Sequence, residues 1–193
     1  MTRLRTIVTH LEMTAPPSRS GRFTPSVRTA LMRTGDMPLH FYRYLQAVIG
    51  ERWFWWMRRA MDDASLTAIV HDPQVEIYIL YADGSPAGLG ELDRRVAGEV
   101  EVAYFGLIPE RIGQGLGAFF MDRLLDAAWH PNDQAVPDRV WLHSCNLDHP
   151  GAIRFYQRSG FVPYNRVEEI IEDPRETGII SAATPLPDGV EIL

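Results

Sequence analysis

The chain has 193 residues, of which 46% are hydrophobic and 23% are charged, with 15 glycines and 14 prolines. This usage is typical of globular proteins and excludes collagen-like, coiled-coil and disordered classes, and the length corresponds to one domain. The formal net charge of -6 argues against nucleic acid or an anionic membrane as the main partner, because no basic excess is present to neutralise phosphates. The expected partner is a small molecule or another protein.

Cys145 is the only cysteine, so the chain has neither an intrachain disulfide nor a Cys-rich zinc site. His143 and His149 lie near it without metal-ligand spacing, and no bound metal is expected. The N-terminal residues lack the uninterrupted apolar run of a signal peptide, and 18 apolar residues in a row occur nowhere. These features predict a cytoplasmic protein without a membrane span.

The first part of the chain predicts one strand and two helices. Residues 4–13 suggest an edge strand, and a loop follows. Asp36 and Pro38 mark a helix start, after which apolar residues recur at helical spacing up to Gly50. A second helix is predicted from Glu51, with an apolar stripe formed by Trp53, Trp56, Met57, Ala60 and Met61.

From Gln74 the hydrophobic period becomes that of strands. Residues 74–95 predict a hairpin around Asp83-Gly84, and the next strand ends at Pro109, with Val100, Val102 and Tyr104 expected on one face. A helix then runs to about Trp129, and a short strand, a helix and a final strand follow it. This order predicts a mixed α/β fold in which helices cover one central sheet.

The segment Gln114 to Ala118 lies between a strand and a helix, where backbone N–H groups and the helix N-terminus suit a pyrophosphate. Gly113, Gly115 and Ala118 also match the G-x-G-x-x-A dinucleotide pattern. That pattern normally opens a βαβ unit and requires an acidic residue after the next strand, which here ends at Cys145. A glycine-rich helix start without any ligand is the simpler alternative.

Three motifs occur in order: the strand VEVAYFGLIP, the loop IGQGLG with its G-x-G at Gly115 and Gly117, and the pattern AIRFYQRSGF. With them, the sequence from about Val75 to Val162 resembles the GNAT superfamily of acetyl-CoA-dependent N-acetyltransferases. It departs from the family at Ile112, where Gln or Arg is usual, and at His149, where Asn is frequent.

The resemblance implies a single α/β (α+β) domain over 1–193, with a mixed sheet of about six to seven strands, about four flanking helices, and loosely held ends at 1–20 and 185–193. It implies a split between the strands ending at Leu107 and Cys145, and acetyl-CoA as co-substrate. Backbone groups of one strand would pair with the pantetheine arm, and amides of the loop would hold the pyrophosphate. The implied acetyl-CoA-binding residues are Phe105, Leu107, Gln114, Gly115, Leu116, Gly117, Ala118, Asn146 and His149.

Two residues are candidates for catalysis. Tyr156 matches the family tyrosine that donates a proton or hydrogen bond to the departing sulfur, although helical spacing alone favours a packed ring. Glu101 lies where several members recruit the base for the amine, or it is a solvent-facing strand residue. Phe54 and Trp55 lie off the apolar stripe and suit the acceptor pocket.

The resulting hypothesis is acetyl transfer to an amine of a small molecule or peptide in a ternary complex, with a homodimer as one option. The first alternative is a catalytically silent CoA-binding module of the same fold. The second is a nucleotide-dependent oxidoreductase, which a preference for NAD over CoA would support.

Overall fold

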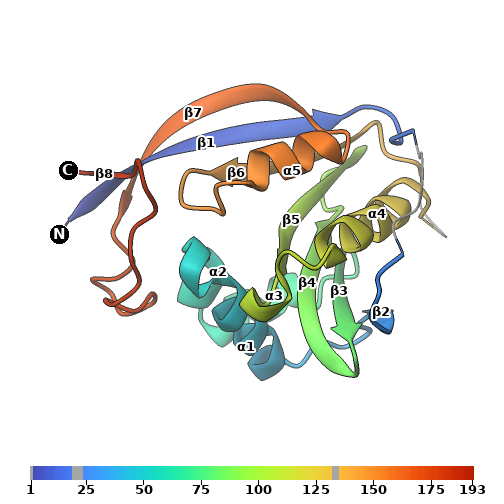
Figure 1. The fold of residues 1–193 in the computed structure, drawn as a ribbon, viewed down its shortest axis with the longest axis horizontal. Coiled ribbons are helices and arrows are strands. Elements are labelled where there is room, and N and C mark those ends of the chain that lie inside the picture. The colour runs from blue at the N-terminus through green and yellow to red at the C-terminus, as the bar shows by residue number, and fades with distance from the viewer. Residues whose placement is uncertain (1, 19–23, 132–134) are drawn as a thin grey trace.

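The computed structural model describes residues 2–18, 24–131 and 135–193 (Figure 1). Parts of the predicted loop after the first strand, and of the break after Trp129, lie outside these ranges. The helices are α1 (Leu39–Gly50), α2 (Met57–Ala60), α3 (Asp63–Val70), α4 (Leu116–Trp129), α5 (Ala152–Arg158) and the 3₁₀ turns η1 (Glu51–Trp53) and η2 (Pro109–Arg111). The strands are β1 (Arg3–Met13), β2 (Thr29–Arg33), β3 (Val75–Ala82), β4 (Ser85–Asp93), β5 (Glu99–Leu107), β6 (Arg139–Cys145), β7 (Val162–Glu172) and β8 (Glu191–Ile192).

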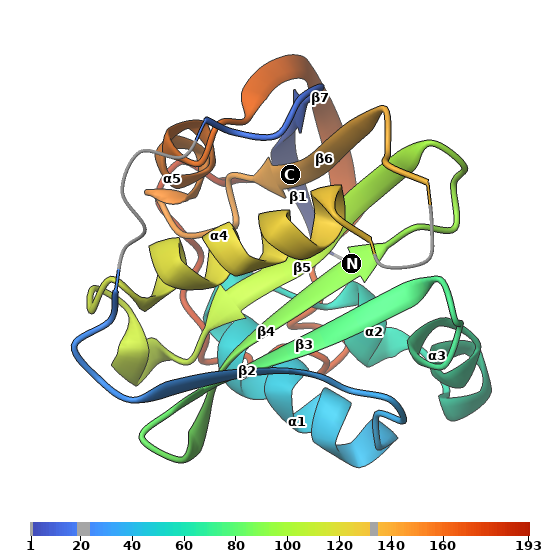
Figure 2. The same cartoon turned by 90° about the vertical axis from the view of Figure 1, so that its right-hand side faces the viewer.

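The strands form one mixed sheet in the order β2-β3-β4-β5-β6-β1-β7, and β8 pairs with β1. Strands β5 and β6 are parallel, and the other neighbours are antiparallel. Helix α4 crosses one face of the sheet, and α1 lies on the other (Figure 2). This confirms the predicted mixed α/β fold with one central sheet. Within the described ranges, no helix is long and apolar enough to cross a bilayer.

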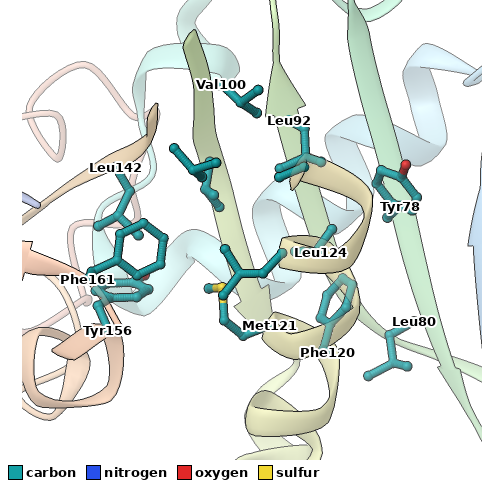
Figure 3. Close-up of a cluster of buried hydrophobic side chains, with 14 of the residues drawn as sticks. Tyr78, Leu80, Leu92, Val100, Phe120, Met121, Leu124, Leu142, Tyr156 and Phe161 are labelled. Atoms are coloured by element: carbon teal, nitrogen blue, oxygen red, sulfur yellow. The ribbon is translucent and has the colours of Figure 1, made fainter. Parts of the chain in front are cut away.

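The main hydrophobic core lies between α4, α5 and the sheet (Figure 3). Phe120 and Leu124 of α4 are fully buried there, as is Leu92 of β4. At Gly90, a Cβ atom would lie 2.5 Å from Cδ1 of Leu124, so glycine is required where the helix approaches the strand. Tyr156 and Phe161, both from the AIRFYQRSGF pattern, complete this core.

Strand β1 corrects the expectation of an edge strand and a loose N-terminus. Residues 8–13 pair with β6 on one side, and residues 3–12 pair with β7 on the other. The C-terminus is held by the same strand, because Leu193 donates its N–H to the Arg3 carbonyl at 2.8 Å, beside β8. An alternating pattern of apolar and polar residues indicates that one face of a strand is buried. It does not indicate whether one or both edges of the strand are paired.

The predicted second helix is also wrong. It breaks after η1 because Phe54 adopts a left-handed backbone with φ of 56°, and α2 resumes only at Met57. The break places the Trp55 side chain on Gly50, where a Cβ would lie 2.4 Å from the Cβ of Trp55. Helix α3, which was not predicted separately, is capped by Asp62, whose carboxylate accepts the Ser65 N–H at 2.7 Å.

A β-bulge in β5 changes which side chains face the two helical layers. Glu91 is opposite Tyr104 and Leu92 is opposite Val102, which leaves Ala103 as an extra residue. Val102 therefore belongs to the core under α4, whereas Tyr104 packs on Trp55 at a ring distance of 5.0 Å. The predicted common face of Val100, Val102 and Tyr104 ends at the bulge.

Candidate active site

The sheet opens between β5 and β6. The two strands pair at three positions, the last being Glu101 with Trp141. Beyond it, β5 continues to Leu107 while paired with β4 alone, and β6 continues to Cys145 while paired with β1. In residues 102–107 of β5, the backbone N–H and C=O groups that point toward β6 therefore have no strand partner. This is the split that the family resemblance predicts at this position.

One cavity lies in the split, and a second adjoins it at the end of β6. The smaller has a volume of about 400 Å³ and reaches Tyr156, and the larger has about 950 Å³ and reaches Ile112 and Pro150. They share four lining residues, namely Trp53, Ser144, Cys145 and Asp148. The cavities therefore adjoin along the split. Among the described residues, no group of three or more His, Cys, Asp or Glu side chains is arranged to hold a metal ion.

The glycine loop lies at the N-terminus of α4. Gly113 and Gly115 have φ of 82° and 77°, and Gly115 is the N-cap residue. First-turn N–H groups of a helix have no intrahelical acceptor, so the backbone from 115 to 118 can donate to an anion. Gln114 directs its side chain elsewhere, since Nε2 donates to the Glu110 carbonyl at 2.7 Å. The loop thus fits a pyrophosphate through its backbone.

Phe105 and Leu107 pack their side chains into the core under α4. Phe105 stacks on Phe155 with ring centroids 5.5 Å apart, and Leu107 is 9% exposed. A Cβ at Gly117 would lie 3.6 Å from the Phe155 ring, which is ordinary contact. These side chains shape one wall of the split, and Phe105 also lines the smaller cavity.

Tyr156 lines the smaller cavity and is otherwise enclosed by aromatic rings. Its nearest ring neighbours are Phe155 and Phe161, at 5.5 and 6.2 Å between centroids. Burial raises the pKa of Tyr156 above its ordinary value, and the charge of Asp148 adds to that effect. The phenol is therefore protonated at neutral pH and able to donate a hydrogen bond.

Asn146 and His149 line the larger cavity, and each also makes a local structural contact. The Asn146 side-chain oxygen accepts the Ile7 N–H at 2.8 Å, which ties the end of β6 to β1. His149 Nδ1 accepts the Gly151 N–H at 2.9 Å, and its ring contacts Trp53 at 5.1 Å.

Glu101 lies at the last paired position of β5, with Oε1 3.2 Å from Nδ1 of His143. His143 lines the smaller cavity, whereas Glu101 is not among its lining residues. The hydrogen bond to Glu101 raises the pKa of His143, against the effect of burial. Sequence reasoning missed this pair, because only the β5–β6 register brings the two residues together. Burial raises the pKa of the nearby Cys145 to about 12, so its thiol stays protonated.

Phe54 and Trp55, predicted for the acceptor pocket, both line the smaller cavity. Phe54 is only 4% exposed and packs in a separate cluster with Leu4, Leu147 and Ile180. Trp55 has more contact with the split, because its indole hydrogen bonds to Asp148 and packs on Tyr104.

Solved structures of GNAT proteins share this fold at low sequence identity. A GCN5-related N-acetyltransferase from Kribbella flavida is 20% identical, with a TM-score of 0.52 over 86% of this chain and 57% of its own. A tandem GNAT protein from the clavulanic acid biosynthesis pathway is 17% identical, with a TM-score of 0.57 over 86% and 53%. Spermidine N-acetyltransferase from Vibrio cholerae is 16% identical, with a TM-score of 0.52 over 77% and 95%. The chain spans about half to three-fifths of the first structures that it matches.

A family model described as the acetyltransferase (GNAT) family matches residues 39–161, more than half of the chain. Curated protein sequences give no significant match. The matched residues include both strands of the split, the helix start at Gly115 and the cavity residue Tyr156. With the fold, the open strand edge and this match in agreement, the chain belongs to the GNAT family of acetyltransferases.

Proposed function

We propose that the protein transfers an acetyl group from acetyl-CoA to an amine. The observation that carries the proposal is the unpaired edge of β5 from 102 to 107, which lies between the helix start at Gly115 and the cavity that holds Tyr156. An extended pantetheine arm could pair with this edge as an added strand does. Its pyrophosphate would meet the N–H groups of the first turn of α4.

Acetyl-CoA supplies an activated thioester, so the chain needs few side chains for chemistry. The strand edge and the split orient the thioester beside the smaller cavity, where the acceptor amine binds. Tyr156 donates a hydrogen bond to the sulfur as negative charge develops there. Because its surroundings keep the phenol protonated, this donor is present throughout the neutral pH range.

Two measurements test the proposal. Calorimetry with acetyl-CoA should show binding, and release of the CoA thiol should follow addition of an amine. Tyr156→Phe should lower kcat by about 10²-fold or more with acetyl-CoA affinity unchanged, because the lost contact strengthens only in the transition state. The phenylalanine keeps the ring packing against Phe155 and Phe161.

Each other outcome has a distinct meaning. Acetyl-CoA binding without turnover on any amine would replace the proposal with a CoA-binding module. Binding of NAD in preference to CoA would replace it with a nucleotide-dependent oxidoreductase. Unchanged kcat in folded Tyr156→Phe would assign the tyrosine to packing.

A further inference from the structure

The smaller cavity extends across the split in the sheet. Tyr156 and Phe105 line it on the side of α4 and α5, and Trp55 and Met57 line it on the side of α2. Its volume of about 400 Å³ lies within the range of roughly 300–1,000 Å³ that is usual for sites that bind small molecules. The size therefore suits a small molecule better than a segment of a folded protein.

Aromatic rings form a large part of its walls. Trp53, Trp55, Trp56 and Trp141 all line the cavity, together with Tyr104. Such rings bury apolar groups well, and their faces also attract cations. The walls thus favour a ligand with an apolar or aromatic body, and they tolerate a positive charge on it.

The polar groups of the lining favour a positive charge as well. Two carboxyl groups line the cavity, Asp148 and Glu169, and the remaining titratable groups besides tyrosine and cysteine are His10 and His143. No arginine is among the described residues that line it, and the chain contains no lysine. An anionic ligand would find no guanidinium group there, whereas an ammonium group would find two carboxyl groups.

One polar pair in this wall has the geometry of a positioned base. His143 is engaged at Nδ1 by Glu101, at 3.2 Å, and its side chain remains 35% exposed. Nε2 is therefore the nitrogen that remains for a ligand. The other titratable groups around it are His10 of β1, Asp148 after β6 and Glu169 of β7. Burial and the charge of His143 lower the pKa of His10.

We propose that this cavity binds a small amine with one ammonium group and an apolar or aromatic body, and that His143, positioned by Glu101, removes the ammonium proton. The inference rests on the proposed function. One proton passes from the ammonium nitrogen to Nε2, and the neutral nitrogen then bonds to the acetyl carbonyl carbon while the carbon–sulfur bond breaks. The second N–H proton ends on the departing sulfur, and His143 returns the first to solvent.

The acceptor class is tested by rates of thiol release from acetyl-CoA with matched amines. Because the chain has no lysine, its own side chains offer no competing ammonium groups. We expect kcat/KM for 2-phenylethylamine to exceed by at least about 10-fold the values for ethylamine, which lacks the ring, and for 4-(2-aminoethyl)benzoate, which adds an anion. Spermidine, with several charges, should also be poorer. A preference for any of these three over 2-phenylethylamine would overturn the acceptor assignment.

The base is tested by the pH dependence of kcat/KM with the best amine. In the wild type, kcat/KM should fall as the pH drops below the pKa of His143, which gives the pH profile an acid limb. His143→Gln should lack that limb, and its kcat/KM near neutral pH should be lower by about 10²-fold. The pH dependence that remains should follow the ionisation of the amine itself. Glu101→Gln should keep the limb but move it to lower pH, and His130→Gln, which removes an exposed histidine outside this cavity, should leave it in place.

A measurement that does not require turnover accompanies these rates. NMR titration of the His143 ring should give a pKa above about 6.5 in the wild type and a lower value in Glu101→Gln. If His143→Gln turns over substrate with an unchanged acid limb, this inference is overturned and the proposed function stands. If the limb is lost in Glu101→Gln but kept in His143→Gln, Glu101 is the base. Absence of turnover in the wild type would overturn the proposed function and this inference with it.

Discussion

Arg58→Met should be the most informative change outside the split, because it leaves a buried carboxylate without its cation. Glu91 is fully buried, and it accepts hydrogen bonds from Arg58 at 2.7 Å and from the Tyr42 hydroxyl at 2.5 Å. The Arg58 side chain is itself only 11% exposed. Removal of one partner of a buried ion pair costs about 3–5 kcal/mol in the free energy of unfolding. For a chain of this size, that loss lowers Tm by roughly 6–20 °C.

Urea denaturation would measure the loss, with two variants as controls. Arg95→Met breaks a more exposed ion pair with Asp93 and should cost less than about 1 kcal/mol. Combining Arg58→Met with Glu91→Gln removes both charges, and it should recover much of the stability lost in Arg58→Met alone. If Arg58→Met and Arg95→Met cost the same, the argument from the buried charge is refuted.

Three further changes test the loop, the cavity wall and the C-terminus. Gly115→Val should weaken acetyl-CoA binding by at least about 10-fold in calorimetry. Gly178→Val is the control, because Gly178 also has a positive φ, of 74°, with open space around it, and this variant should bind acetyl-CoA normally. Gly106→Ala, with its Cβ 2.5 Å from Ile49 Cγ2 and 2.9 Å from the Trp55 ring, should raise the acceptor KM and cost about 1–3 kcal/mol in denaturation. Burial acts to raise the pKa of Glu51, but hydrogen bonds from the Ser181 N–H and other donors lower it overall. The contribution of Glu51 to stability is therefore present above its ordinary pKa and lost as pH falls. The difference in free energy of unfolding between the wild type and Glu51→Gln should shrink in acid, and a constant difference would contradict this.

The local elements that carry the family motifs were accessible from the sequence. The G-x-G loop before α4, the meander of β3 to β5 and the helix that holds Tyr156 all follow from periodicity, glycine placement and turn residues. These signals are local, because a left-handed turn at Gly115 or a hydrophobic stripe on α4 depends on residues a few positions apart. The same motifs indicated the split between β5 and β6 through the resemblance.

Contacts between distant segments required the tertiary structure. Alternation in residues 3–13 predicts a strand, but its place between β6 and β7 depends on pairing with residues at least 127 positions away. The bulge at Ala103 lies in the pairing with β4, and Phe54 at the left-handed turn packs with Leu4, Leu147 and Ile180, so neither has a local signature. His143 meets Glu101 only through the register of two parallel strands. The sequence by itself thus determined most of the elements and the glycine loop before α4, and the strand register decided which side chains meet in the split.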